Sequence, residues 1–349
     1  IYEALAGKAE ALADLYRQTS DESCLMLAYR CHQLASQAEQ ELRRWLLYES
    51  SQINLIAQSR ARIGHAIGLA RELYERTQDE QYLLQGWAFA EQLKSAVLAD
   101  AVRRHRQVGK EARAIQRLRK QVAYFERQLL LRPSHKNRLS WLTERDALKE
   151  KLRAAYERSG QSAVMEEHRS FQPRRYTAKE GSAVIEYYVG DSAVEVFACL
   201  PGGALRWLRL PQPDSLKTAV LAFRGLLQDR QTLETSREYP ALAHRLYQSL
   251  IEEVLPRLPK QVLIVPDAWL SALPFEALYT RPGGMDWAEA PFALQEADFH
   301  YAFSLSVLEQ QRALPADAAE GLLHFAPRFL DGARGIPTLM QATSEIPDS

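Results

Sequence analysis

The sequence predicts an α-helical solenoid, then a long helical hairpin, and finally an α/β domain. Three observations lead to this fold class. Apolar residues recur every three to four positions through residues 1–107, which indicates amphipathic helices. The same spacing continues over residues 108–159 beneath a basic surface. From residue 181 onward, short β-branched runs alternate with helical patterns, which is typical of a layered sheet covered by helices.

The first 107 residues contain an internal repeat. The run at 15–22, L-Y-R-Q-T-S-D-E, returns 58 positions later at 73–80 as L-Y-E-R-T-Q-D-E. The shared Thr and Asp mark a helix end and the N-cap of the next helix, so each copy predicts a helical hairpin that must stack to bury its apolar face. The period exceeds the 34 residues of a tetratricopeptide repeat. We therefore interpret the region as tetratricopeptide-like with elongated helices. It would bind a protein or peptide partner, and a helical spacer is the alternative.

Residues 108–159 predict two helices with a coiled-coil-like seam, broken at Pro133–Asn137. The expected seam positions are Val108, Ala112, Ile115, Leu118, Val122, Phe125, Leu129, Leu139, Leu142, Leu148, Leu152 and Ala155. Residues 103–158 hold 17 Lys and Arg against 6 Asp and Glu. A nucleic-acid or acidic-partner surface is an open interpretation. A solvated face is favoured because no groove-reading motif accompanies the charge.

Residues 160–180 form the expected linker, since Ser, Gln, His and Pro gather there. Residues 181–349 then predict an antiparallel meander, two helices and a buried strand with both faces covered. The meander strands lie at 183–189, 194–200 and 205–210, the helices at 214–230 and 239–258, and the buried strand at 262–265. Further strands at 299–303 and 321–326 flank a helix at 304–312.

The run at 262–278, V-L-I-V-P-D-A-W-L-S-A-L-P-F-E-A-L, resembles the signature of the CHAT family, the caspase-like domain associated with tetratricopeptide repeats. That signature reads roughly I-P-D-G-x-L-x-x-L-P-F-E-A-L, so Ala268 replaces a glycine and affects the turn geometry. Residues 183–197 and 90–98 are also similar to this family. We interpret Asp267, Pro274 and Glu276 as fold-forming residues, with a place near a substrate cleft as the alternative.

The resemblance implies a bacterial cysteine endopeptidase related in fold to caspases and separase, whose thiolate attacks a peptide carbonyl beside a histidine. Neither the H-x-A-T-H-G-like nor the S-A-C-x-T-G-like motif of the family occurs in residues 1–349. His324 and Cys199 are the nearest substitutes, and both are favoured as strand residues. We therefore assign no catalytic residue. We expect a fragment, open at both ends, that carries the first half of the domain. Peptidase activity would need a downstream His/Cys segment, and an inactive interaction scaffold is the alternative.

Composition and motifs predict no cofactor and favour a reducing compartment. The chain of 349 residues has equal numbers of basic and acidic side chains, and no apolar run approaches the ~18 residues of a membrane span. Cys24, Cys31 and His32 could share a helical face but are favoured as packing residues. With neither a P-loop nor G-x-G-x-x-G present, we expect no metal or cofactor. The three cysteines form no disulfide framework, which favours a reducing cytoplasmic setting.

Overall fold

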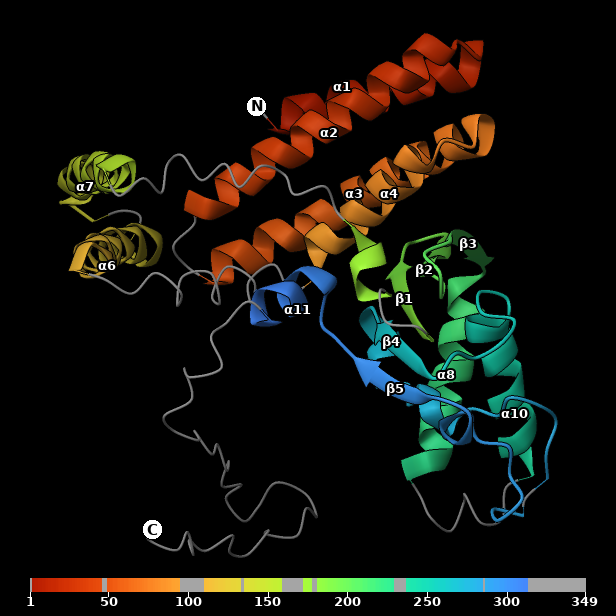
Figure 1. Cartoon of the computed structure of the whole chain (residues 1–349). Coiled ribbons are helices and arrows are strands. Elements are labelled where there is room, and N and C mark those ends of the chain that lie inside the picture. The colour runs from red at the N-terminus through yellow and green to blue at the C-terminus, as the bar shows by residue number, and fades with distance from the viewer. Residues whose placement is uncertain are drawn as a thin grey trace, which may run out of the picture. The chain divides into compact units, whose positions relative to one another are not determined.

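Four helices form two antiparallel hairpins in the N-terminal part of the chain (Figure 1). The computed structural model describes residues 2–45, 49–94, 110–132, 135–158, 172–177, 181–228, 237–284 and 286–312. Helices α1 (Tyr2–Thr19) and α2 (Glu22–Trp45) make the first hairpin, and α3 (Glu49–Thr77) and α4 (Glu80–Leu93) make the second. Helix α2 packs against α3, so the two hairpins lie side by side.

The internal repeat predicted from the sequence is confirmed by its hydrogen bonds. A threonine near the end of α1 and of α3 bonds back to the carbonyl four residues earlier, and an aspartate accepts the backbone N–H two residues later in the next helix. These bonds are Thr19 to Leu15 (2.8 Å), Thr77 to Leu73 (2.7 Å), Asp21 with Ser23 (2.9 Å) and Asp79 with Gln81 (2.9 Å). Both turns place the residue before the aspartate, Ser20 or Gln78, at positive φ. Each copy therefore ends one helix and caps the next in the same way.

A five-stranded mixed sheet follows, with the strand order β3-β2-β1-β4-β5. Its strands are β1 (Ser182–Val189), β2 (Ala193–Cys199), β3 (Leu205–Pro211), β4 (Gln261–Val265) and β5 (Asp298–Tyr301). The first three strands form the predicted antiparallel meander, whereas β4 runs parallel to both β1 and β5. The carboxyl ends of β1, β4 and β5 therefore lie at one edge of the sheet.

Helices cover both faces of the sheet, because side chains alternate along each strand. On β1, Ala183, Ile185 and Tyr187 join the core that includes helices α8 (Pro213–Gln228) and α10 (Glu238–Tyr247). Val184 and Tyr188 point to the other face, into the core built by α1–α4. The sheet is thus the middle layer between the helical hairpins and α8–α10. The predicted double-sided burial of Val262–Val265 is confirmed, although Leu263 is only partly buried.

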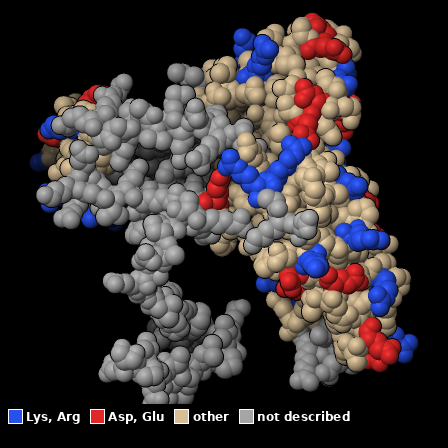
Figure 2. Space-filling model, viewed as in Figure 1, with Lys and Arg blue, Asp and Glu red and all other residues tan. Residues whose placement is uncertain are grey.

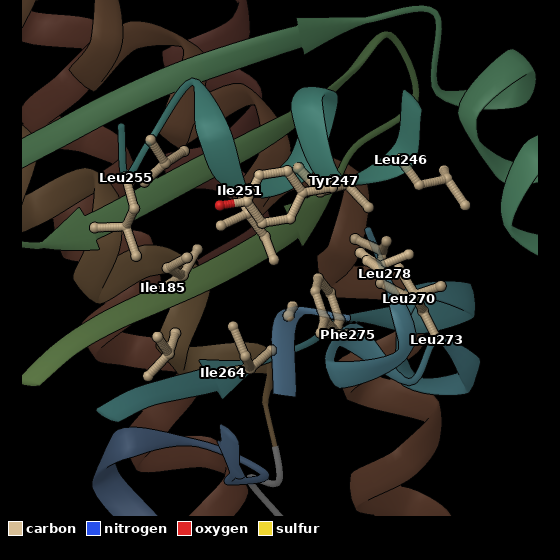
Figure 3. Close-up of a cluster of buried hydrophobic side chains, with 14 of the residues drawn as sticks. Ile185, Leu246, Tyr247, Ile251, Leu255, Ile264, Leu270, Leu273, Phe275 and Leu278 are labelled. Carbon is tan, nitrogen blue, oxygen red and sulfur yellow. The ribbon is translucent and has the colours of Figure 1, made fainter. Parts of the chain in front are cut away.

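The core beneath α10 is continuous with the segment after β4 (Figure 3). Ile185 and Ile264 pair across β1 and β4, and Ile251 and Leu255 cover them. The turn residues after β4 enter the same core, namely Leu270, Leu273, Phe275 and Leu278. Helix α10 passes into a π-helical turn (Gln248–Glu252). The predicted helix over 239–258 therefore ends early, although its stripe, Leu242, Leu246, Leu250 and Val254, is buried as expected.

Helices α6 (Lys110–Leu131) and α7 (Arg138–Arg158) pack against each other as a hairpin, as expected. Ile115, Val122, Leu148 and Leu152 are buried along the predicted seam. Leu139 was predicted there too, but its side chain is 78% exposed, because it lies in the first turn of α7 beside the break. The expected boundary at 107–108, most of the 160–180 linker, the strand at 321–326 and His324 lie outside the described residues.

Helix α8 also differs from its predicted start. We expected this helix to begin at residue 214, but it begins at Pro213. Proline suits the first position of a helix because the N–H that it lacks has no partner within the helix. The carboxylate of Asp214 therefore lies in the first turn, where it interacts favourably with the helix dipole.

Candidate functional site

The segment after β4 lies at the edge where the parallel strands end, which is where open α/β sheets place ligand sites. The side chain of Asp267 links the strand ends at this edge. Its carboxylate accepts the backbone N–H of Val189 at the end of β1 (2.7 Å) and the guanidinium of Arg60 from α3 (2.5 Å). Arg60 also donates to the Val189 carbonyl (2.8 Å). Asp267 therefore holds the ends of β1 and β4 together and ties both to the second helical hairpin, a fold-forming role.

Pro274 and Glu276 belong to the turn that follows. Pro274 precedes a short 3₁₀ helix (Phe275–Ala277). The Tyr301 hydroxyl accepts the Phe275 backbone N–H (2.9 Å) and donates to the Glu276 carboxylate. Because Tyr301 ends β5, these bonds join the turn to the neighbouring strand. Both residues have structural contacts here.

A second carboxylate, that of Glu186 on β1, is completely buried on the side of the sheet that faces α4. Trp87 Nε1 donates to it (2.7 Å), and Lys94 Nζ lies 3.1 Å from its other oxygen. The same ammonium donates to the Val265 carbonyl at the end of β4 (3.1 Å). Burial raises the pKa of Glu186 well above its ordinary value, and the nearby Glu91 adds to this while Lys94 opposes it.

A third carboxylate, that of Glu195 on β2, repeats the arrangement. Its side chain is 7% exposed and lies 3.1 Å from Arg71 of α3, with Trp207 Nε1 donating at 2.9 Å. Burial raises the pKa of Glu195, while Arg71 and Arg209 oppose the rise. Three acids of the sheet region thus each meet a cation from α3 or α4. For the two more deeply buried pairs, those of Glu186 and Glu195, removing one partner costs ~3–5 kcal/mol, since one charge is left without its partner.

Glu91 of α4 makes a different contact. Glu91 is only 6% exposed. One carboxylate oxygen accepts the Leu305 backbone N–H (2.8 Å), and the other accepts the backbone N–H and the hydroxyl of Ser306 (3.0 and 2.7 Å). These groups begin helix α11 (Leu305–Arg312). A carboxylate suits this place because it satisfies free N–H groups and interacts with the positive end of the helix dipole.

The cysteines lack the surroundings of a nucleophile. Cys199 is buried in β2, 3.3 Å from the Thr177 hydroxyl, and burial raises the pKa of its thiol. A raised pKa keeps the thiol protonated, which disfavours attack on a carbonyl. Cys24 and Cys31 are buried in α2 near His32, whose pKa burial lowers to about 4. Among the described residues, no group of three or more His, Cys, Asp or Glu side chains could hold a metal ion.

The sequence interpretation singled out Asp267, Pro274 and Glu276 but missed Glu91, Lys94, Glu186 and Glu195. A signal was present. Glu186 and Glu195 each interrupt an otherwise apolar strand, and Glu91 and Lys94 stand three apart near the end of a largely apolar helix. Charges in such runs are rarely buried unless they are paired. The pairing itself required the fold, because the partners are 92 and 124 positions apart.

Fold and site together define a protein in which a helical hairpin is joined by ion pairs to a mixed α/β sheet. Residues 240–345 match the family model of the CHAT domain, so this part of the chain is similar to that family. The match includes the 262–278 signature. It does not reach the N-terminal helices, so their tetratricopeptide-like assignment stays a prediction. No curated protein matches the chain. None of the helices described is long and apolar enough to cross a membrane.

Proposed function

We propose that this chain is the partner-binding front part of a caspase-like cysteine endopeptidase of the CHAT family. Its helical hairpins would bind a protein or peptide partner, and peptidase activity would need a downstream segment carrying the histidine and the cysteine. The family match over residues 240–345 supports the class. The lack of both dyad motifs in the sequence supports a chain that does not cleave peptides by itself.

The contact of the Glu91 carboxylate with the start of α11 is the observation that supports a link between partner binding and the enzymatic half. It holds the first residues of α11, and α11 leads directly into the rest of the family match. A partner that binds the α1–α4 hairpins more tightly when α4 is displaced than when α4 is in place would weaken this cap. Only such differential binding shifts an equilibrium between two states. The helices would then influence the segment after α11.

The first test reads the coding sequence beyond Ser349 and assays the completed protein for cleavage of an unfolded protein such as casein. Strands ending in His-Gly and in Ser-Ala-Cys, with activity abolished by replacing that cysteine with alanine, would support the proposal. A sequence without both motifs, or a completed protein without activity in the presence of its partner, would refute the enzyme. The protein would then be an interaction scaffold, which is the alternative function.

The link through α4 has its own test. We expect Glu91→Gln to speed hydrogen exchange of the α11 amides, because an amide lacks the charge that favours the helix N-terminus and offers only one acceptor oxygen. The loss should be ~1–2 kcal/mol in the local opening free energy. Glu309→Gln is the matched control, since Glu309 lies on α11 and pairs with Arg175 at the surface (3.0 Å). Equal exchange in the two variants would show that Glu91 does not hold α11.

The compartment and the basic hairpin complete the proposal. We infer a cytoplasmic location, which the three free, buried cysteines support. Nucleic-acid binding through α6–α7 is a weaker candidate, since part of its charge is paired within the hairpin, as in Lys149–Glu126 (2.9 Å). Acidic and basic side chains are interspersed over the described part of the face in Figure 2. Binding that falls steeply with added salt would favour this candidate, and binding insensitive to salt would exclude it.

A further inference from the structure

Two acids and one base meet where α4, β1 and α11 come together. Glu186, Glu91 and Lys94 are 0%, 6% and 8% exposed. One ammonium balances one carboxylate, so two ionised acids would leave an unbalanced negative charge in the core. Such a charge is costly to bury, and a carboxyl in this position holds a proton instead. The cluster therefore has the composition of two carboxyls that titrate together.

The hydrogen bonds of the two acids differ. Glu91 accepts three bonds from the start of α11, and the positive end of a helix favours an ionised carboxylate. On Glu186, Oε2 accepts the Trp87 N–H, whereas Oε1 accepts no hydrogen bond from the described part of the chain. The Lys94 ammonium lies 3.1 Å from Oε1 but directs its hydrogen bond to the Val265 carbonyl.

The side chains of Glu91 and Glu186 are also hydrogen-bonded to each other. An ionised carboxyl has no hydrogen to donate, so a bond between two carboxyls requires a proton on one of them. Because both oxygens of Glu91 already accept bonds from α11, Glu186 is the donor. Burial and then the charge of Glu91 raise the pKa of Glu186 well above its ordinary value, which agrees with this assignment.

Lys94 is the cation that opposes the protonation of Glu186. On the elements packed against this face of the sheet, the other groups are uncharged or paired elsewhere, namely Phe197 of β2, Val265 of β4, Tyr188 of β1, and Arg60 and Arg71 of α3. Both arginines pair with other acids of the sheet region. Lys94 lowers the pKa of Glu186 by less than burial and Glu91 raise it.

We propose that Glu91 and Glu186 share one proton at neutral pH, and that this proton holds the start of α11 on α4. The inference builds on the Glu91 contact of the proposed function and names what controls it. Loss of the proton puts two carboxylates side by side in the core. Glu186 cannot move away because β1 is the central strand, whereas Glu91 meets the exposed Ser306 near the end of α4. The repulsion therefore breaks the bonds between Glu91 and α11.

The release is confined to the first turn of α11. The Tyr176 hydroxyl still donates to the Leu305 carbonyl (2.7 Å), and Arg175 still pairs with Glu309 (3.0 Å). Neither contact involves the shared proton. When the first turn opens, Glu91 turns toward water and leaves Glu186 beside Lys94, which favours the ionised form of Glu186. Each opening then releases one proton to water.

The sign of the pH dependence follows from this proton. The closed state keeps it over a range above pH 4.5, the ordinary value for Glu186, where the open state has lost it. Opening is therefore suppressed at low pH and rises by ~tenfold for each pH unit within that range. Hydrogen exchange of the Leu305 and Ser306 amides, corrected for base-catalysed exchange, measures this from about pH 5 to about pH 9.

Variants of the two buried strand acids separate the effect from a general weakening of the fold. Glu186→Gln should remove the pH dependence of opening, because its amide donates to Glu91 at every pH. Glu195→Gln is the matched control and should keep it, since Glu195 is also a buried strand acid bonded to a tryptophan but pairs with Arg71. Circular dichroism confirms that each variant is folded.

Infrared spectroscopy of the unmodified chain, with its glutamates labelled with carbon-13, tests the proton directly. We expect the carbonyl band of a protonated glutamic acid at pH 7, where an ordinary glutamate with a pKa of ~4.3 is ionised. The band should disappear in Glu186→Gln and remain in Glu195→Gln. Absence of the band from the unmodified chain, or its persistence in Glu186→Gln, would overturn the proposal.

The exchange data keep this inference apart from the proposed function. If Glu91→Gln leaves α11 exchange unchanged, the link through α4 is wrong, and shared control of α11 is wrong with it. If Glu91→Gln speeds exchange but the unmodified chain shows no pH dependence of opening, the link holds and the shared proton is refuted. Neither result depends on peptidase activity.

Discussion

His32 on α2 is a buried histidine whose charge the fold excludes. It is 1% exposed, and its burial, followed by the positive charge of nearby Arg62, lowers its pKa from 6.5 to about 4. A base with a depressed pKa in the folded state binds a proton first in the unfolded chain. Stability is therefore lost as pH falls from 6.5 toward 4, by up to ~3 kcal/mol from this group.

We predict that His32→Leu removes this loss. Urea unfolding of the variant should show a flatter pH dependence than the unmodified chain between pH 6.5 and 4. His300→Gln is the control, because His300 is exposed on β5 and should leave the slope unchanged. Parallel pH curves for the unmodified chain and His32→Leu would mean that His32 is accommodated as a cation in the fold.

Ala268 is strained at the turn after β4. Its φ is 49°, a left-handed conformation that costs a residue with a Cβ ~1–2 kcal/mol. The family signature has glycine at this place, and the structure gives the physical reason. We predict that Ala268→Gly stabilises the chain by ~0.5–1 kcal/mol in urea unfolding, after the entropy that glycine loses on folding. Ala277→Gly, at a residue without positive φ, should destabilise it. A loss of stability in both variants would contradict the strain.

At the scale of elements, helix α4 reaches the sheet closely because it carries a glycine. A Cβ on Gly86 would lie 2.5 Å from the ring of Trp207. That ring cannot easily move, since it lies near the rings of Phe197 and Tyr74 (4.8 and 5.9 Å between centroids). The close approach of α4 is what lets Glu91 and Lys94 reach their partners.

We predict that Gly86→Ala destabilises the chain by ~1–3 kcal/mol, although alanine favours a helix by ~1 kcal/mol. The matched control is Gly68→Ala on α3, where a Cβ would meet nothing within 4 Å. The Gly68→Ala control should be stabilised by about the helix-propensity difference between glycine and alanine. Thermal unfolding of both variants gives the comparison, and a stabilised Gly86→Ala would mean that Trp207 yields at little cost.

At the scale of the whole molecule, local patterns predicted the elements well and their pairing poorly. The repeat bonds around Thr19 and Thr77 and the buried strand at 262–265 follow from short-range chemistry, which a sequence displays directly. The order of β1, β4 and β5, and the ion pair between Lys94 and Glu186, join residues far apart in the chain. Leu139 and the early end of the 239–258 helix were misjudged because periodicity marks a face but not where the packing against it stops.

The described helices α1–α4 and the sheet share one core, because Trp87 of α4 and Phe197 of β2 stack at 5.6 Å within the same cluster. We therefore predict that damage on the far face of the sheet reaches the helices. Phe275→Ala should cost ~3–5 kcal/mol by leaving a cavity near Tyr187. Hydrogen exchange should then speed up in α3 and α4 as well as in β1 and β4, since these elements open together.

The α6–α7 hairpin provides the internal comparison, because its buried residues belong to neither of the two core clusters. Its amides should exchange at the same rate with and without Phe275→Ala. If α3 and α4 instead kept their protection while only the sheet lost it, the ion pairs of Lys94 and Arg71 would join two units that unfold separately. A movement of the helices would then not be transmitted to the sheet through a shared core. The Glu91 carboxylate would be the remaining contact between α4 and α11.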